Sequence, residues 1–252
     1  MTEPLLRVEQ VSKRFGGLLA VDQASFTAAP GCITALIGPN GAGKTTLFAI
    51  ITGFLRPSEG RVVYDGADIA GEAPHRVARR GIARTFQVVQ PFAGLNVREN
   101  IAVGAHLMRP ARADALAAAD DVARAVGLGG LLDQEAASLT VAGRKRLELA
   151  RALAIEPRLL LLDEVLAGLN PSEIRDMVPV IRTIRDRGVS IVMIEHVMQA
   201  VMSLAEHVFV LSEGRIIAEG SPHTIASDPR VVEAYLGHGA AQRMTASGIA
   251  HG

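Results

Sequence analysis

Apolar and polar positions alternate along the first 66 residues in the manner of β-strands, with short turns between the runs. The pattern predicts strands at Leu5–Val11, Val21–Ala28, Cys32–Ile37 and Arg61–Tyr64. From Thr45 to Thr52 the apolar spacing becomes helical, and Gly53 is a suitable helix-ending residue. The chain is therefore expected to begin with β-structure and to place its first helix directly after the third strand.

The middle of the chain has an alanine-rich, helical texture. Asn96 and Glu99 form the pattern of a capping box at the start of one helix. Further helices are predicted over Ala111–Val126 and over Gly143–Ile155, the latter ending shortly before a proline. A helical lobe is thus predicted between two parts of the chain that are richer in β-structure.

In the last third of the chain, apolar strands and amphipathic helices alternate, which is typical of a parallel sheet. Leu159–Leu162 and Val189–Ile194 are apolar throughout or nearly so, as expected for strands buried on both faces. Between them, Asn170 is placed to cap a helix whose apolar residues fall on one face. His207–Leu211 and Arg215–Glu219 predict a hairpin.

Residues 38–45 match the pattern G-x-x-x-x-G-K-[ST] and lie between an apolar strand and a helix. Glycines let the backbone curl so that N–H groups point at phosphate oxygens, and the helix start adds its positive dipole end. Lys44 supplies a charge for the β- and γ-phosphates, and the Thr45 hydroxyl is a suitable ligand for Mg²⁺. The sequence predicts a nucleotide-phosphate site made of Gly38, Pro39, Asn40, Gly41, Ala42, Gly43, Lys44, Thr45 and the following Thr46.

Two acids follow the apolar strand that begins at Leu159. Asp163 is placed to hold Mg²⁺, and Glu164 is placed to polarise an attacking water. The alternative, a strand whose terminal acids only face solvent, is disfavoured by the phosphate loop. Asp163 lies far along the chain from Lys44, so an insertion must separate the two, and the helical lobe is the candidate. The chain has no Asn-Lys-x-Asp guanine motif, which disfavours a small GTPase.

Composition narrows the class of protein. Lys+Arg and Asp+Glu number 26 each, so a basic excess that would favour nucleic-acid binding is missing. Cys32 has no cysteine to pair with, which favours a reducing compartment. The N-terminus does not read as a signal peptide, and no apolar run reaches the roughly 18 residues of a spanning helix. We expect a cytoplasmic protein that reaches a membrane only through partners.

Four segments give the chain a family resemblance. Arg84-Thr85-Phe86-Gln87, Leu139–Leu153, Asp163-Glu164 and Glu195-His196 occur in the order and spacing of ABC transporter nucleotide-binding subunits. The resemblance extends from Leu5 to about Leu236. It implies an α/β fold: a P-loop NTPase core of the ABC ATPase type, with an antiparallel β edge built from N- and C-terminal segments and an inserted helical subdomain. Residues 1–88 and 156–236 would form the core, 89–155 the helical subdomain, and 237–252 a flexible tail.

The resemblance also implies roles for single residues. Phe15 would stack on adenine, the alternative being a core Phe in the first hairpin. Gln87 would ligate Mg²⁺ together with Thr45 and Asp163, and would sense the γ-phosphate. His196 would contact the γ-phosphate and act in catalysis with Glu164, Lys44 and Gln87.

Leu139–Gly143 takes the place of the family's L-S-G-G-Q signature, which serves the ATP held by a second subunit. Thr140 keeps the hydroxyl, and Thr140, Ala142 and Gly143 would act in trans, although the sequence departs from the family here. The next three residues, 144–146, are basic at a helix start, where positive charge opposes the dipole. Either a nearby anion or acidic partner, or simple solvation of the three side chains, would account for them.

The altered signature segment resembles that of the ATP-binding subunits of branched-chain and hydrophobic amino acid importers, and so do Gln90–Leu95 and Glu233–Gly237. The resemblance implies an ATPase with ATP and Mg²⁺ as cofactors. Its partners would be a second ATPase subunit, either a copy of itself or a paralogue, in a head-to-tail dimer, two membrane permeases on whose cytoplasmic side it sits, and indirectly a secreted substrate-binding protein. Two alternatives are the ATPase of a lipid or polysaccharide exporter and a soluble ABC ATPase for iron–sulfur assembly.

Overall fold

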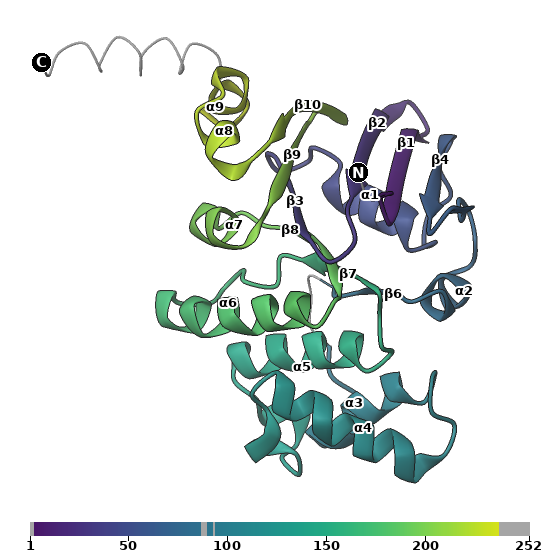
Figure 1. Ribbon diagram of the computed structural model, residues 1–252, viewed down its shortest axis with the longest axis vertical. Helices are drawn as coiled ribbons and strands as arrows, with labels where there is room; N and C mark the ends of the chain where they lie inside the picture. The colour runs from purple at the N-terminus through teal and green to yellow at the C-terminus, as the bar shows by residue number, and fades with distance from the viewer. Residues whose placement is uncertain (1–2, 87–89, 93, 237–252) are drawn as a thin grey trace, which may run out of the picture.

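The computed structural model describes residues 3–86, 90–92 and 94–236 (Figure 1). Its centre is a six-stranded sheet in the order β10-β9-β3-β8-β7-β6. The strands are β3 (Ile33–Ile37), β6 (Ile82–Arg84), β7 (Leu159–Asp163), β8 (Ser190–Ile194), β9 (His207–Ser212) and β10 (Arg215–Gly220). Neighbouring strands from β9 to β6 are parallel, and β10 pairs antiparallel with β9. Every residue of β3, β7 and β8 is buried, as their apolar sequences predict.

A second sheet of four antiparallel strands has the order β2-β1-β4-β5. Its strands are β1 (Leu6–Phe15), β2 (Leu18–Ala28), β4 (Glu59–Tyr64) and β5 (Ala67–Asp68). The predicted α/β class, with parallel and antiparallel β-structure, is confirmed. The antiparallel part is divided, however: the N-terminal strands form this separate sheet, and the C-terminal hairpin β9–β10 edges the parallel one.

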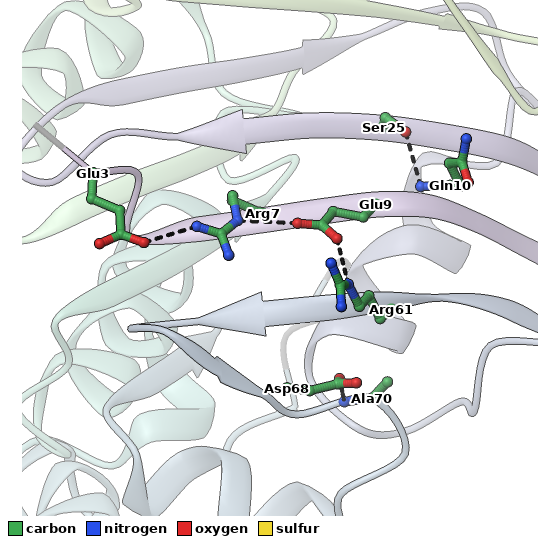
Figure 2. Close-up of polar contacts among 8 residues, drawn as sticks. All are labelled: Glu3, Arg7, Glu9, Gln10, Ser25, Arg61, Asp68 and Ala70. Atoms are coloured by element: carbon green, nitrogen blue, oxygen red, sulfur yellow. Dashed lines mark hydrogen bonds and ion pairs between the residues drawn. The ribbon is translucent and has the colours of Figure 1, made fainter. Parts of the chain in front are cut away.

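Polar contacts link the strands of this second sheet on either side of an irregularity in β1 (Figure 2). The pairing of β1 with β4 shifts register between Glu9 and Ser12, and Gln10 takes a positive φ of 49°. The N–H of Gln10 donates to the hydroxyl of Ser25 on β2 at 2.9 Å. Glu9 accepts hydrogen bonds from Arg7 on its own strand and from Arg61 on β4. Because these ion pairs are partly exposed, we expect each to contribute little to stability.

Nine α-helices occur in the described ranges: α1 (Lys44–Ile51), α2 (Pro74–Arg79), α3 (Val97–Ala105), α4 (Arg112–Ala125), α5 (Val141–Leu153), α6 (Pro171–Asp186), α7 (Met198–Leu204), α8 (Pro222–Ala226) and α9 (Pro229–Leu236). Two 3₁₀ turns, at Gly129–Leu131 and Ala136–Ser138, precede α5. The capping boxes expected at Asn96 and at Asn170 are both formed. Helices α3, α4 and α5 pack on one another at the lower end of the molecule in Figure 1.

The parallel sheet separates two apolar cores. Leu159 and Leu161 of β7 face the core that contains Phe48 of α1 and residues of β1. Leu160 and Leu162 face the core formed with α3 to α7, which contains Ile181. The alternation follows from the two-residue period of a strand. None of the helices in the described ranges is long and apolar enough to cross a membrane.

Candidate functional site

The carboxyl ends of three adjacent parallel strands meet at one edge of the central sheet. β3 leads into the phosphate loop, β7 ends at Asp163, and β8 ends just before Glu195 and His196. The carboxyl edge is where ligands bind in open parallel sheets. Segments that lie far apart in the sequence are therefore brought together by the strand order β3-β8-β7.

Two glycines of the phosphate loop are fixed by close backbone neighbours. A Cβ on Gly38 would lie 1.9 Å from the carbonyl oxygen of Leu211, and one on Gly43 would lie 2.5 Å from that of Ala20. Their φ angles of 151° and 105° are also disfavoured for other residues. The N–H of Gly214 donates to the carbonyl of Ala42 at 3.0 Å. The loop is thus held between the first hairpin and the β9–β10 turn.

Lys44 begins α1 with its ammonium group folded over the loop. Its Nζ donates to the carbonyl oxygens of Gly38 at 2.8 Å and of Pro39 at 2.9 Å, and the residue is only 6% exposed. Burial lowers the pKa of Lys44, and the nearby carboxylates of Glu164 and Asp163 oppose that shift. A buried cation at a helix N-terminus, among inward-facing amides, is suited to bind a polyphosphate.

Asp163 is buried at the end of β7 and is paired with Arg84 of β6. Arg84 Nη2 donates to Asp163 Oδ2 at 2.7 Å, and the backbone N–H of Asp163 donates to the hydroxyl of Thr85 at 2.9 Å. Burial raises the pKa of Asp163, and the Arg84 guanidinium opposes the rise. Oδ1 of Asp163 is buried and has no hydrogen-bond partner among the described residues. Asp163 and Thr45 line the same cavity of ≈ 830 Å³.

Glu164 and His196 are in direct contact. Nε2 of His196 lies 2.7 Å from Oε1 of Glu164, so the residues that follow β7 and β8 are joined by a hydrogen bond. Glu164 has a φ of 50°, and its backbone is held by Ile194 and by the ammonium of Lys145, which donates to its carbonyl at 3.1 Å. A non-glycine residue with positive φ is uncommon, and here the two backbone contacts hold it in that conformation.

Glu195 is a buried carboxyl at this edge to which the sequence assigned no separate role. It is 1% exposed, and its Oε1 accepts the backbone N–H of Leu166 at 2.9 Å. Burial raises the pKa of Glu195 to about 7, with Glu164 adding to the rise and Lys145 opposing it. The only sequence signal was its place at the end of an apolar strand. Glu195 ties the segment after Glu164 to the segment that carries His196.

We expect Glu195→Gln to change the pH dependence of stability. A carboxyl whose pKa is 4.5 when unfolded and about 7 when folded destabilises the native state as pH rises from 4.5 to 7. Relative to the parent, the variant should therefore gain about 3 kcal/mol in free energy of unfolding between pH 4.5 and pH 8. Urea unfolding at both pH values measures this gain. Glu206→Gln is the control, because Glu206 also accepts a backbone N–H but is 39% exposed, and parallel pH profiles for Glu195→Gln and the parent would contradict the expectation.

Phe15 lies at the end of β1, next to the tight turn that leads into β2, and it is 45% exposed. The alternative of a core Phe is therefore wrong. Lys13 Nζ lies 5.2 Å from the centroid of its ring. The exposed ring is free to stack on a planar group, although adenine stacking itself stays a prediction.

The segment expected to act in trans lies at the start of α5. Thr140 is exposed, and its hydroxyl accepts the N–H of Gly143 at 3.1 Å, so it is the N-cap of the helix. The basic residues that follow are not simply solvated: Arg144 donates to the carbonyls of Leu139 and Ala137, Lys145 to that of Glu164, and Arg146 to that of Val126. These bonds to carbonyl oxygens account for positive charge at a helix start.

Gln87 lies outside the described residues, so its expected contacts with Mg²⁺ and the γ-phosphate stay predictions. The residues on either side of that segment contact α5. The N–H of Phe86 donates to Glu148, and the carbonyl of Gln90 accepts from Arg151 at 3.0 Å. Helix α5 therefore carries both the Thr140 segment and the anchors of the segment that contains Gln87.

Family models and curated relatives agree with this geometry. Residues 21–167 match the family described as ABC transporter, and residues 215–241 match the C-terminal family of branched-chain amino acid ATP-binding cassette transporters. The chain is 37% identical over 253 residues to the high-affinity branched-chain amino acid transport ATP-binding protein BraF of Pseudomonas aeruginosa. It is also 37% identical to LivG of Escherichia coli, described in the same words. In both comparisons the match covers 94% of this chain and 99% of the relative.

Solved structures have the same fold. A nucleotide-free ATP-binding cassette from an ABC transporter superposes with a TM-score of 0.86 at 32% identity, covering 94% of this chain and 100% of that one. An ATP-binding cassette in its ADP conformation gives a TM-score of 0.85 at 33% identity, with the same coverage. The chain therefore belongs to the ABC transporter family, as an ATP-binding subunit that hydrolyses ATP to drive transport.

Proposed function

We propose that this ATPase energises the import of branched-chain or other hydrophobic amino acids. The observation that carries the proposal is the meeting of Lys44, Asp163, Glu164 and His196 at one sheet edge, in a chain similar over nearly its whole length to BraF and LivG. The alternatives, a lipid or polysaccharide exporter and iron–sulfur assembly, are not favoured, because the relatives are named for amino acid transport.

The phosphate loop binds ATP in this proposal. Backbone N–H groups of the loop and of the start of α1, together with the Lys44 ammonium, replace the water around the phosphates, and the helix dipole of α1 favours their negative charge. Phe15 covers one face of the adenine, because its ring is exposed at the hairpin beside the loop.

The donor set fits Mg²⁺. Asp163 presents a buried carboxylate oxygen that has no partner in the described part of the chain, and the Thr45 hydroxyl lines the same cavity. Hard oxygen donors of this kind are the ligands that Mg²⁺ takes. Thr45, Asp163 and Gln87 would hold the ion, which when bound neutralises phosphate charge.

Glu164 is the general base in this proposal. It accepts a proton from the attacking water, and His196 holds its carboxylate in place through the 2.7 Å contact. When ATP is bound, His196 also contacts the γ-phosphate. Lys44 stabilises the charge that develops on the transferring phosphoryl group.

Two ATPase subunits, this chain and either a second copy or a paralogue, close head to tail over two ATP molecules. Residues 1–88 and 156–236 act as the nucleotide-binding core, and residues 89–155 act as the subdomain that presents Thr140, Ala142 and Gly143 to the ATP of the other subunit. The start of α5 supplies backbone N–H groups and the Thr140 hydroxyl for this contact. Membrane permeases convert opening and closing of the pair into substrate movement.

Thr140→Ala tests the contact in trans. The variant loses an N-cap, so it should lose about 1 kcal/mol of stability. It should also hydrolyse ATP more slowly while each isolated subunit binds ATP as tightly as before, as measured by calorimetry and phosphate release. Thr140→Ser is the control because it keeps the hydroxyl. Unchanged ATPase activity in Thr140→Ala would contradict the role in trans.

Reconstituted transport tests the function as a whole. The chain, purified with two candidate permeases and a binding protein, should drive ATP-dependent uptake of labelled leucine into vesicles, and Glu164→Gln should abolish it.

In cells, the chain should sediment with membranes only when the permeases are co-expressed, and chaotrope should release it. ATP-dependent efflux, or membrane retention of the chain alone, would overturn the proposal.

A further inference from the structure

The ion pair of Arg84 with Asp163 is buried to an unusual degree. Their side chains are 8% and 1% exposed, whereas each other ion pair in the described part of the chain has a partner at least 31% exposed. Removing both charges from water is costly, and the mutual attraction returns that cost only with good geometry. A pair of this kind needs a reason beyond stability.

Neighbouring residues fix the guanidinium in place. The rings of Phe48 and Phe86 lie 5.8 and 5.3 Å from Cζ of Arg84, so both can attract its charge. The backbone N–H of Thr85 donates to Leu161, and the Thr85 hydroxyl accepts from Asp163. These two hydrogen bonds of Thr85 join the ends of β6 and β7 next to the ion pair.

The contact uses only one carboxylate oxygen. Arg84 Nη2 binds Oδ2, whereas Oδ1 of Asp163 is buried without a hydrogen-bond partner among the described residues. A carboxylate can accept more than one strong donor, so Oδ1 is left for a second cation. Thr45, near the start of α1, lines the same cavity and provides a further oxygen.

We propose that Arg84 is a built-in counter-cation for Asp163: it neutralises the carboxylate by Oδ2 in the nucleotide-free chain, so that a divalent cation binds at Oδ1 only together with ATP. The inference rests on the proposed role of Asp163 as a metal ligand. With Arg84 in place the ion pair is neutral overall, and a free divalent cation is repelled by the guanidinium at short range. The triphosphate supplies the negative charge that makes metal binding favourable.

Metal binding without nucleotide tests the proposal. Mn²⁺ is the probe, counted by electron paramagnetic resonance at pH 8 with and without a non-hydrolysable ATP analogue. The parent should bind Mn²⁺ weakly alone and tightly with the analogue. Arg84→Gln should bind Mn²⁺ alone about tenfold more tightly or better, because one repelling charge is gone. Arg84→Lys keeps the charge and should behave as the parent does.

Thermal unfolding gives an independent readout. A ligand that binds only the folded state raises the melting temperature, so Mn²⁺ alone should stabilise Arg84→Gln and leave the parent almost unchanged. Arg80→Gln is the matched control, because it breaks the exposed Arg80–Glu72 pair. It should not alter Mn²⁺ binding. If Arg84→Gln does not fold, the parent itself still tests the proposal: Mn²⁺ bound as tightly without the analogue as with it would overturn it.

Asp163→Asn separates this inference from the assignment of the metal site. If Asp163→Asn still binds Mn²⁺ tightly with the ATP analogue, the proposed metal site itself is wrong. If Asp163→Asn loses that binding while Arg84→Gln binds Mn²⁺ alone no better than the parent, the metal site stands and the counter-cation proposal is overturned. Equal gains in Arg84→Gln and Arg84→Lys would also overturn it, because charge would then not be the cause.

Discussion

Glu164→Gln is expected to bind ATP normally and to lose nearly all turnover. The amide keeps the size of the side chain and can still hydrogen-bond to His196, but it cannot take a proton from water. A positioned base contributes on the order of 10²–10⁴-fold in rate, so hydrolysis should fall by that factor. Because each bound ATP contacts both subunits in the proposed pair, the closed pair should accumulate with Mg-ATP and elute as a dimer in size exclusion.

Glu156→Gln is a matched control for this variant. Glu156 has a similar positive φ, 54° against 50°, but its side chain is 51% exposed and lies between α5 and β7. It should keep both turnover and monomer–dimer behaviour. Normal turnover in Glu164→Gln, tested alone and with permeases or a paralogous ATPase present, would show that Glu164 is not the base.

Lys44→Ala should fail at the earlier step and bind ATP poorly. In the proposed site the ammonium contacts phosphates in the ground state, and a hydrogen bond to a charged group contributes about 1.5–3 kcal/mol, so affinity should fall about 10- to 100-fold. Calorimetric titration with ATP measures the loss, and the closed pair should not form. Arg124→Ala removes an equally positive but exposed side chain on α4 and should bind as the parent does. Parental ATP affinity in Lys44→Ala would contradict its place in the phosphate site.

Patterning predicted the central strands and the long helices well, because their apolar residues are periodic and their caps are explicit. β3, β7, β8 and both capping boxes lie where expected. Short elements that depend on tertiary contacts were not predicted. β6 has three residues and is a strand because it pairs with β7, and α2, α8 and α9 have at most eight residues each.

Within the site, the sequence identified residues whose chemistry depends on type and spacing. The carboxyl edge of the parallel sheet brings together four of the predicted residues: Lys44, Asp163, Glu164 and His196. The sequence did not indicate that Arg84 pairs with Asp163, because β6 itself was not predicted. Nor did it indicate that Lys145 donates to the backbone of Glu164. These contacts join residues 79 and 19 positions apart, and only the tertiary fold brings them together.

Side chains of β7 face the two cores in turn, and this alternation limits where residues can be inserted or deleted. Residues 159 and 161 face one core and residues 160 and 162 the other, and the next two positions are Asp163 and Glu164. Inserting or deleting one residue in this strand would turn the leucines on one side of the change toward the opposite core, or move both acids by one position so that one of them takes the place of the other. We therefore expect that no insertion or deletion is tolerated within Leu159–Asp163. By contrast, exposed connections such as the one between α3 and α4 can lengthen or shorten without displacing the site.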